Sequence, residues 1–339
     1  MASIAFESLK LATNECNIYG GFFVFSIGVI GNVLNIIIFS SLKTFREMSS
    51  TFYMTVTSAV NIFQLIFGLL TRILINGYNI DPTKTSSFMC KARQFILITT
   101  MLIVFTCMCF AAIDQFLLLT NPWRHLCNLQ LASRLVIIAF IVSFLHGIPV
   151  ILFQDLYPPL VTGQTSCSFT SIGYSICYSR FLFPILLAIL PLTVRITFGV
   201  LAFVNVRGLH NRQVPIVRLE RDKQLTAMVL VEVAIDVIVS LPYSIYNYFY
   251  TSAVTFPDQI SVAENQFISS VTRIIFYGNF SLPFYIYCCV SSRFHRQLVH
   301  VLTNVPLKYR QETMNRCRMN QITPQLTVDA NMVLSLTAW

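Results

Sequence analysis

Seven apolar segments separated by short polar stretches constrain what this chain can fold into. Each is close to the roughly 20 residues that an α-helix needs to cross a hydrocarbon layer about 30 Å thick. The segments lie at roughly 18–42, 51–76, 91–113, 131–153, 179–204, 225–250 and 266–290. Only 11% of the residues are charged, whereas soluble domains carry about 25%. The sequence therefore predicts an all-α membrane protein, a bundle of seven transmembrane helices.

The basic residues indicate how the bundle is oriented. They gather in the first, third and fifth connections and after the last segment, a distribution typical of the cytoplasmic side. They are Lys43, Arg46, Arg124, Arg134, Arg207, Arg212, Arg218, Arg221, Lys223, Arg293, Arg296, Lys308, Arg310, Arg316 and Arg318. The same rule explains the net charge of +9, so we expect the lipid bilayer rather than nucleic acid as a partner.

Three regions follow from this orientation. Residues 1–17 lack an apolar core, so we expect an extracellular N terminus without a cleavable leader. The transmembrane domain then covers 18–302, and 303–339 forms a cytoplasmic tail. At the end of the domain, apolar side chains recur at the spacing of one helix face: Phe294, Leu298, Val301 and Leu302. An amphipathic helix on the cytoplasmic membrane surface explains this pattern, and a frayed tail is the alternative.

A set of short motifs occurs in a fixed order along the segments. They are Gly31–Asn32 in the first, Asn61 within TFYMTVTSAVNIF in the second, Cys90 and Asp114 at the ends of the third, Pro191 in the fifth, Pro242 in the sixth, and Asn279, Pro283 and Tyr287 in the seventh. The run DQFLLLTNPWRH follows the third segment. In order and spacing, the chain resembles the rhodopsin-like (class A) G-protein-coupled receptors over roughly 18–302.

The chain also departs from that family's pattern. Gln115 stands where the family has arginine, Ser240 where it has a tryptophan, and Gly199 where it has a tyrosine. The chain thus resembles a divergent member, of the kind found in large invertebrate orphan sets. With Asn61 for aspartate and Pro283 for asparagine, the family's sodium site is not expected. No CxxC, HExxH or glycine-rich phosphate loop occurs, so we expect no metal and no cofactor.

The resemblance implies a disulfide between Cys90, at the outer end of the third segment, and Cys167 in the second outer loop. An oxidising exterior favours this bridge, and two free thiols are the alternative. Cys16 and Cys177 also face outside in this arrangement and could form a second bridge.

At the inner end, the resemblance assigns Asp114, Gln115 and Asp222 to the positions of the family's ionic lock. Gln115 cannot form the arginine–carboxylate pair, so we expect a weak lock. Trp123, after Pro122, matches the bulky residue that inserts into the G protein. A membrane-interface anchor is the alternative for Trp123, because tryptophan favours that depth.

Arg195 lies deep inside the fifth predicted span, and Glu232 and Asp236 lie inside the sixth. Charges in hydrocarbon are costly and seldom unpaired. Their similar depth predicts a pair of Arg195 with Asp236 or with Glu232. The pair could act as an activation switch together with Tyr287 and a helix kink expected at Pro242. Alternatively, it could serve only as a structural bridge.

The ligand set is implied only by family position: Arg93, Leu97, Met101, Tyr243, Asn247, Arg273 and Tyr277 should line the outer cavity. Leu97 stands where amine receptors need an aspartate, so an amine is disfavoured. Arg93 and Arg273 could hold a carboxylate, which favours a peptide or a small acidic ligand. Alternatively, both arginines simply extend outward to water.

The function that we expect is that of a plasma-membrane receptor, which an extracellular ligand drives toward a state open to a heterotrimeric G protein. A transporter or ion channel with a pathway through Arg195, Glu232 and Asp236 is the alternative, disfavoured by the lack of an internal repeat. We expect no enzymatic activity, because neighbouring spans lack a Ser/His or paired-Asp motif and His146 stands alone.

Overall fold

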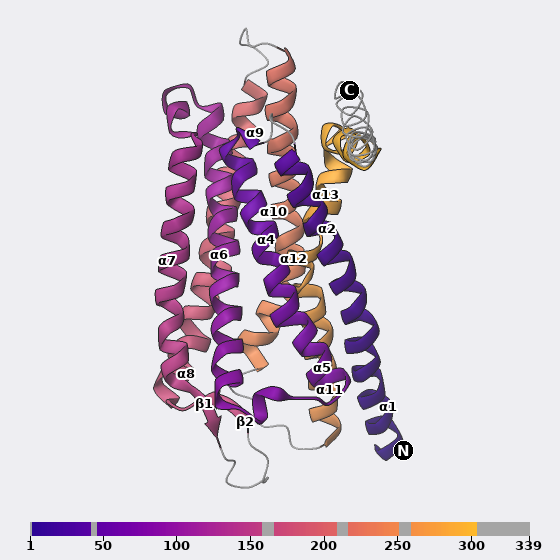
Figure 1. Cartoon of the computed structure of the whole chain (residues 1–339). Coiled ribbons are helices and arrows are strands. Elements are labelled where there is room, and N and C mark those ends of the chain that lie inside the picture. The colour runs from indigo at the N-terminus through magenta and orange to yellow at the C-terminus, as the bar shows by residue number, and fades with distance from the viewer. Residues whose placement is uncertain (1, 42–45, 158–165, 209–215, 251–258, 304–339) are drawn as a thin grey trace, which may run out of the picture. The chain divides into compact units, whose positions relative to one another are not determined.

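The computed structural model describes residues 2–41, 46–157, 166–208, 216–250 and 259–303. The chain divides into two units, Met1–Ser291 and Ser292–Trp339. The first contains all the long helices, which run side by side as a bundle (Figure 1). In the second, 292–303 form a helix, in agreement with the helix expected from the apolar spacing.

The first six predicted spans correspond to six helical runs. They are α1 (Ala2–Glu15) with the π-helical turn Cys16–Gly20 and α2 (Gly21–Ser41); α4 (Ser49–Gln64) with the π-helical turn Leu65–Leu70 and α5 (Thr71–Gly77); α6 (Ser87–Leu119); α7 (Leu129–Phe153); α8 (Ile172–Cys177) with the π-helical turns Tyr178–Leu182 and Ile185–Ile189 and α9 (Leu190–Gly208); and α10 (Ile216–Tyr250). Six helices among the described residues are long and apolar enough to cross a membrane. The predicted all-α membrane bundle is therefore confirmed.

The seventh predicted span is divided into three short helices. They are α11 (Gln259–Phe276), α12 (Gly278–Ser281) and α13 (Pro283–Val290). Pro283 has no backbone N–H and its ring crowds the carbonyl four residues earlier, which favours an interruption of the helix at this position. The three helices are separated at Tyr277 and at Leu282, the residue directly before the proline. The predicted span exists, but as a bent succession of helices.

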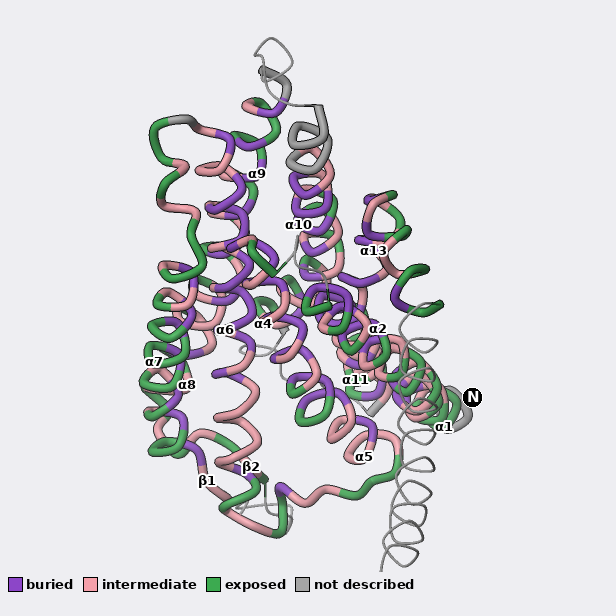
Figure 2. Tube along the Cα trace, turned by 45° about the horizontal axis from the view of Figure 1, so that its top comes forward, coloured by how far each residue is buried: buried purple, intermediate pink, exposed green. Residues whose placement is uncertain are grey.

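The helix α6 is the centre of the bundle, because it packs against α4, α7 and α9. Its buried side chains include Ile98, Met101, Phe105 and Met108, and also residues on its other faces. A helix that is apolar all round is a buried one. The outer helix α7 differs, since large side chains such as Phe140 and Ile141 are exposed along one side (Figure 2). That side suits contact with lipid.

One end of the bundle carries a β-hairpin, formed by β1 (Gln154–Tyr157) and β2 (Ser166–Phe169). The strands are antiparallel, with Leu156 opposite Cys167. Cys167 forms a disulfide with Cys90 at the start of α6, and their Cα atoms are 5.7 Å apart. The predicted disulfide is thus confirmed, and we call this end of the bundle the disulfide end. The second bridge considered from the sequence is absent, because Cys16 and Cys177 are both free.

Candidate functional site

Two neighbouring cavities open among the helices at the disulfide end, and both are lined by Arg72 and Arg273. The larger has a volume of about 430 Å³ and a mostly polar lining that includes Lys10, Asn14 and Asn265. The smaller has a volume of about 110 Å³, and its lining is rich in aromatic side chains. A polar mouth beside an apolar pocket is the usual composition of a ligand site.

Most of the residues implied by the family resemblance meet at the smaller cavity. Those that line it are Arg93, Leu97, Met101, Tyr243, Arg273 and Tyr277. Asn247 lines neither of the two cavities. The lining also contains residues that sequence reasoning missed: Gln64, Arg72, Gln94, Ile98, Tyr178, Phe183 and Phe276. Arg72 could have been recognised from the sequence as a candidate site residue, because it is an isolated charge inside an apolar segment.

Within the described part of the chain, the arginines of this site form no salt bridge. Arg93 donates from Nε to Thr71 Oγ1 at 2.8 Å, while its Nη2 is buried without a hydrogen-bond partner. Arg273 donates from Nη2 to Ser269 Oγ at 3.2 Å, and its Nε is also buried and unpartnered. No carboxylate among the described residues forms a salt bridge with either arginine or with Arg72. Guanidinium groups left in this state are suited to a carboxylate or another anion.

Aromatic rings position these cations. The guanidinium of Arg273 lies over the ring of Tyr243, 5.6 Å from its centroid, which is a favourable cation–π distance. Tyr277, the residue directly after α11, is buried and approaches the backbone of Gly68 closely. A Cβ atom at Gly68 would lie 2.5 Å from the Tyr277 hydroxyl, so only glycine leaves room for this ring.

The hairpin is fastened to α6 by a second contact besides the disulfide. Asp155 accepts hydrogen bonds from Ser87 Oγ at 2.6 Å and from the backbone N–H of Leu156 at 2.8 Å, and Lys91 Nζ lies 3.0 Å away. The hydrogen bonds from Ser87 and then Lys91 hold the pKa of this carboxyl at about 2, below its usual range. The hairpin is therefore fixed to the start of α6.

In the middle of the bundle, the structure contains the ion pair that the sequence predicted between Arg195 and Asp236. Both are buried, and the guanidinium Nη2 donates to Asp236 Oδ2. Glu232, also buried, accepts a hydrogen bond from the Tyr287 hydroxyl at 2.9 Å, while its other oxygen has no partner. The helix α10 is thus joined to α9 through Asp236 and to α13 through Glu232.

At the end opposite the disulfide, Asp114 is held by serines of α4. Ser49 Oγ donates to its two carboxylate oxygens at 2.7 and 2.8 Å, and Ser50 Oγ donates to Oδ2. Gln115 Nε2 donates to Ser50 Oγ at 2.7 Å. The two α6 residues predicted for the ionic lock are therefore joined to α4 instead.

Three other residues predicted to take part in G-protein coupling are Asp222, Pro122 and Trp123. The side chain of Asp222 lies outside the described part of the chain. Pro122 and Trp123 are exposed on the short 3₁₀ helix Asn121–Leu126, which fits either G-protein contact or a membrane anchor. Among the described residues, no group of three or more His, Cys, Asp or Glu side chains could hold a metal ion.

Comparisons with known proteins agree with this architecture. Residues 31–282 match the model of the family described as "7 transmembrane receptor (rhodopsin family)". The chain is also similar to the neuromedin U receptor homolog nmur-2 of Caenorhabditis elegans, with 26% identity over 135 residues. That match spans 39% of this chain and 33% of the relative, so it covers a third of the relative's length. On the family match, which extends over most of the chain, the protein belongs to the rhodopsin family of seven-transmembrane receptors.

Proposed function

We propose that this protein is a plasma-membrane receptor for an extracellular ligand that carries a negative charge, and that it signals to a heterotrimeric G protein. The observation that supports this most directly is the group of three arginines at the disulfide end, Arg72, Arg93 and Arg273, which form no salt bridge with any described carboxylate. A buried cation without a counter-charge is costly, so a ligand that supplies the anion gains binding energy there.

The lining of the cavities supports an acidic peptide or a small aromatic acid. Tyr178, Tyr243, Phe276 and Tyr277 offer flat apolar surface to a ring, next to guanidinium groups that suit a carboxylate. None of the described residues that line the two cavities is acidic, so a ligand amine would find no counter-charge among them. The relative is named a neuromedin U receptor homolog, which favours a peptide.

Signalling would use the opposite end of the bundle. In this arrangement the disulfide end faces outside, where an oxidising environment maintains the Cys90–Cys167 bridge. Agonist binding would favour a state in which α10 has moved, so that the end containing Asp114 admits the G protein. The links of α10 to α9 and α13 would oppose that movement in the absence of ligand.

The proposal is tested by presenting the receptor with a library of acidic peptides and aromatic acids, together with their amidated forms, while several G-protein readouts are recorded. An acid should activate, and its amide should be weaker by about tenfold or more, since a charged hydrogen bond contributes roughly 1.5–3 kcal/mol. The variant Arg273→Gln should show the same loss for the acid.

A matched control is Arg180→Gln. Arg180 is a cation on the fifth span that lies over Tyr248, at 5.9 Å, and lines neither cavity. Its loss should leave the potency of the acid unchanged. If Arg273→Gln kept full potency toward an identified acidic agonist, the assignment of the ligand site would be wrong. Ion flux through reconstituted receptor, with no G-protein response, would favour the channel or transporter alternative.

A further inference from the structure

The first helical run extends well beyond the length that a membrane span needs. From Ala2 to Ser41, the helix α1, the π-helical turn and α2 follow without a break. At about 1.5 Å per residue this run is roughly 60 Å long, about twice the thickness of the hydrocarbon layer. The helix α1 lies at the disulfide end (Figure 1), so its first turns rise beside the mouth of the larger cavity.

Contacts with the seventh span hold α1 in a defined position. The helix packs against α11 and α5. Asn17 Nδ2 donates to Ser270 Oγ on α11 at 3.1 Å and to the Thr13 carbonyl at 2.7 Å. Both Asn17 and Thr13 are buried in this contact. The rotation of α1 about its axis is therefore fixed, and with it the direction of each side chain.

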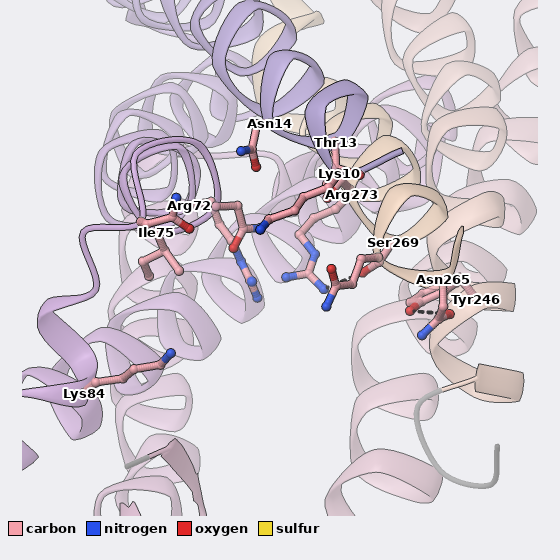
Figure 3. A pocket seen from close by; sticks show the side chains of 14 residues that line it. Lys10, Thr13, Asn14, Arg72, Ile75, Lys84, Tyr246, Asn265, Ser269 and Arg273 are labelled. Atoms are coloured by element: carbon pink, nitrogen blue, oxygen red, sulfur yellow. Dashed lines mark hydrogen bonds between the residues drawn. The ribbon is translucent and has the colours of Figure 1, made fainter. Parts of the chain in front are cut away.

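This rotation turns one face of α1 toward the cavity. Lys10, Thr13 and Asn14, spaced as i, i+3 and i+4, all line it. Figure 3 shows the Lys10 side chain reaching toward the part of the pocket into which Arg72 and Arg273 also point. Lys10 has no carboxylate partner among the described residues, although Glu7 stands one turn earlier on the same helix.

A second lysine of the same cavity provides a contrast. Lys84 also lines it, but its Nζ lies 3.9 Å from Asp81 Oδ2, so its charge is already offset. Four other cations, which form no salt bridge with a described carboxylate, are spread across the two cavities. Lys10 lines only the larger cavity, Arg72 and Arg273 line both, and Arg93 lines only the smaller.

We propose that Lys10 is a ligand-binding residue that selects for a second negative group, and that the ligand is a diacid. One carboxylate lies among Arg72, Arg93 and Arg273, and the other meets Lys10 in the larger cavity. An aromatic group attached to the first carboxylate occupies the smaller cavity. A peptide with an acidic side chain next to a C-terminal aromatic residue has this chemistry. This inference rests on the proposed function and narrows its ligand class.

The test uses four defined probes on the purified full-length receptor: N-acetyl-Asp-Phe, N-acetyl-Asn-Phe and the C-terminal amide of each. Affinity is obtained from the ligand-dependent rise in thermal unfolding temperature. The wild-type receptor should bind the diacid at least tenfold more tightly than either monoacid. Lys10→Gln should remove the advantage over N-acetyl-Asn-Phe and leave the affinity for N-acetyl-Asn-Phe itself unchanged, because its single carboxylate lies among the arginines.

Two further variants separate the possible failures. Arg273→Gln should weaken binding of every acid, whereas Arg180→Gln, at a cation that lines neither cavity, should leave all four affinities unaltered. If Lys10→Gln bound the diacid as tightly as wild type while Arg273→Gln did not, the role of Lys10 would be refuted and the anionic site would stand. A wild-type receptor that did not distinguish the diacid from the uncharged N-acetyl-Asn-Phe amide would refute the anionic ligand itself.

Discussion

The hydroxyl of Tyr287 donates a hydrogen bond to the buried carboxylate of Glu232, with 2.9 Å between the oxygens. One turn along α10, Asp236 accepts from Arg195. Because residues four apart lie on the same helix face, a single face of α10 holds both contacts, one to each neighbouring span. Any rotation or outward movement of α10 must break at least one of them.

The ion pair of Arg195 and Asp236 should be essential for the helices to assemble, and exchanging the two charges should preserve its effect. Arg195→Asp and Asp236→Arg each leave two like charges buried together, which should cost about 3–5 kcal/mol or more and reduce surface expression severely. The double variant restores an opposite pair at the same depth and should recover much of the expression. Surface labelling of intact cells measures this. Equal expression of the double and single variants would contradict the pairing.

Tyr287→Phe should destabilise the receptor. The substitution leaves both oxygens of Glu232 without a partner, at a cost of about 1–3 kcal/mol, and should lower the unfolding temperature of the purified protein. The matched control is Tyr285→Phe, which removes a hydroxyl that donates to the Ile27 carbonyl at the half-buried edge of the bundle. The buried substitution should have the larger effect; the reverse order would argue against a structural role for the Glu232 contact.

Ser50→Ala should raise basal signalling. The serine joins Asp114 and Gln115 of α6 to α4. Its loss should therefore favour the state in which the end containing Asp114 is open, by about 1–2 kcal/mol, which raises the population of that state roughly five- to thirtyfold. Basal nucleotide exchange on a G protein, normalised to surface receptor, is the measurement. Thr55→Ala serves as control, because that hydroxyl bonds only within α4, to the Thr51 carbonyl. Unchanged exchange in Ser50→Ala would show that this cluster does not restrain activation.

Removal of the disulfide should cost about 4 kcal/mol, because it closes a loop with a sequence separation of 77. Cys90→Ser and Cys167→Ser should each lower the unfolding temperature, and the double variant should be no worse than either single variant. Cys177→Ser should leave it unchanged, since that thiol is free and exposed. Additive losses in the double variant would mean that the two cysteines act separately.

The contact of Asp155 with Ser87 and Lys91 should depend on pH in a predictable sense. The folded pKa of about 2 lies below the value of about 3.9 for an unfolded aspartate, so folding favours the charged form. Its stabilising contribution should be complete above about pH 4 and disappear as the pH falls through about 2. Unfolding temperatures of wild type and Asp155→Asn should thus differ at pH 7 and converge at the acid extreme; a gap that widened on acidification would contradict this sign.

Much of the fold and part of the site could be predicted from the sequence. Segment length and depth sufficed for the spans and for the pairing of Arg195 with Asp236, because hydrocarbon leaves buried charges few alternatives. The resemblance to the receptor family added the Cys90–Cys167 bridge. The division of the seventh span at Leu282 was not predicted, although Pro283 gave a signal for it.

Other features depend on packing that one sequence does not reveal. The serines that hold Asp114 and Gln115 belong to α4, and nothing in their spacing indicates which helix they face. Lys10 was placed in an extracellular tail, since its segment is too polar for a membrane span. The structure shows that this segment continues the first span as a helix, and the contact of Asn17 with Ser270 fixes it beside the cavity.

That continuity should make the proposed ligand site sensitive to the rotational register of the first helix. One residue inserted between Lys10 and Asn17 would turn the preceding turns by about 100° relative to the span and direct Lys10 away from the cavity. Seven inserted residues, close to two full turns, would restore its direction but raise it by about 10 Å. The effect of insertions on selectivity for the second carboxylate should therefore vary with the period of the helix. If the segment were unstructured, insertions of every length would have similar effects.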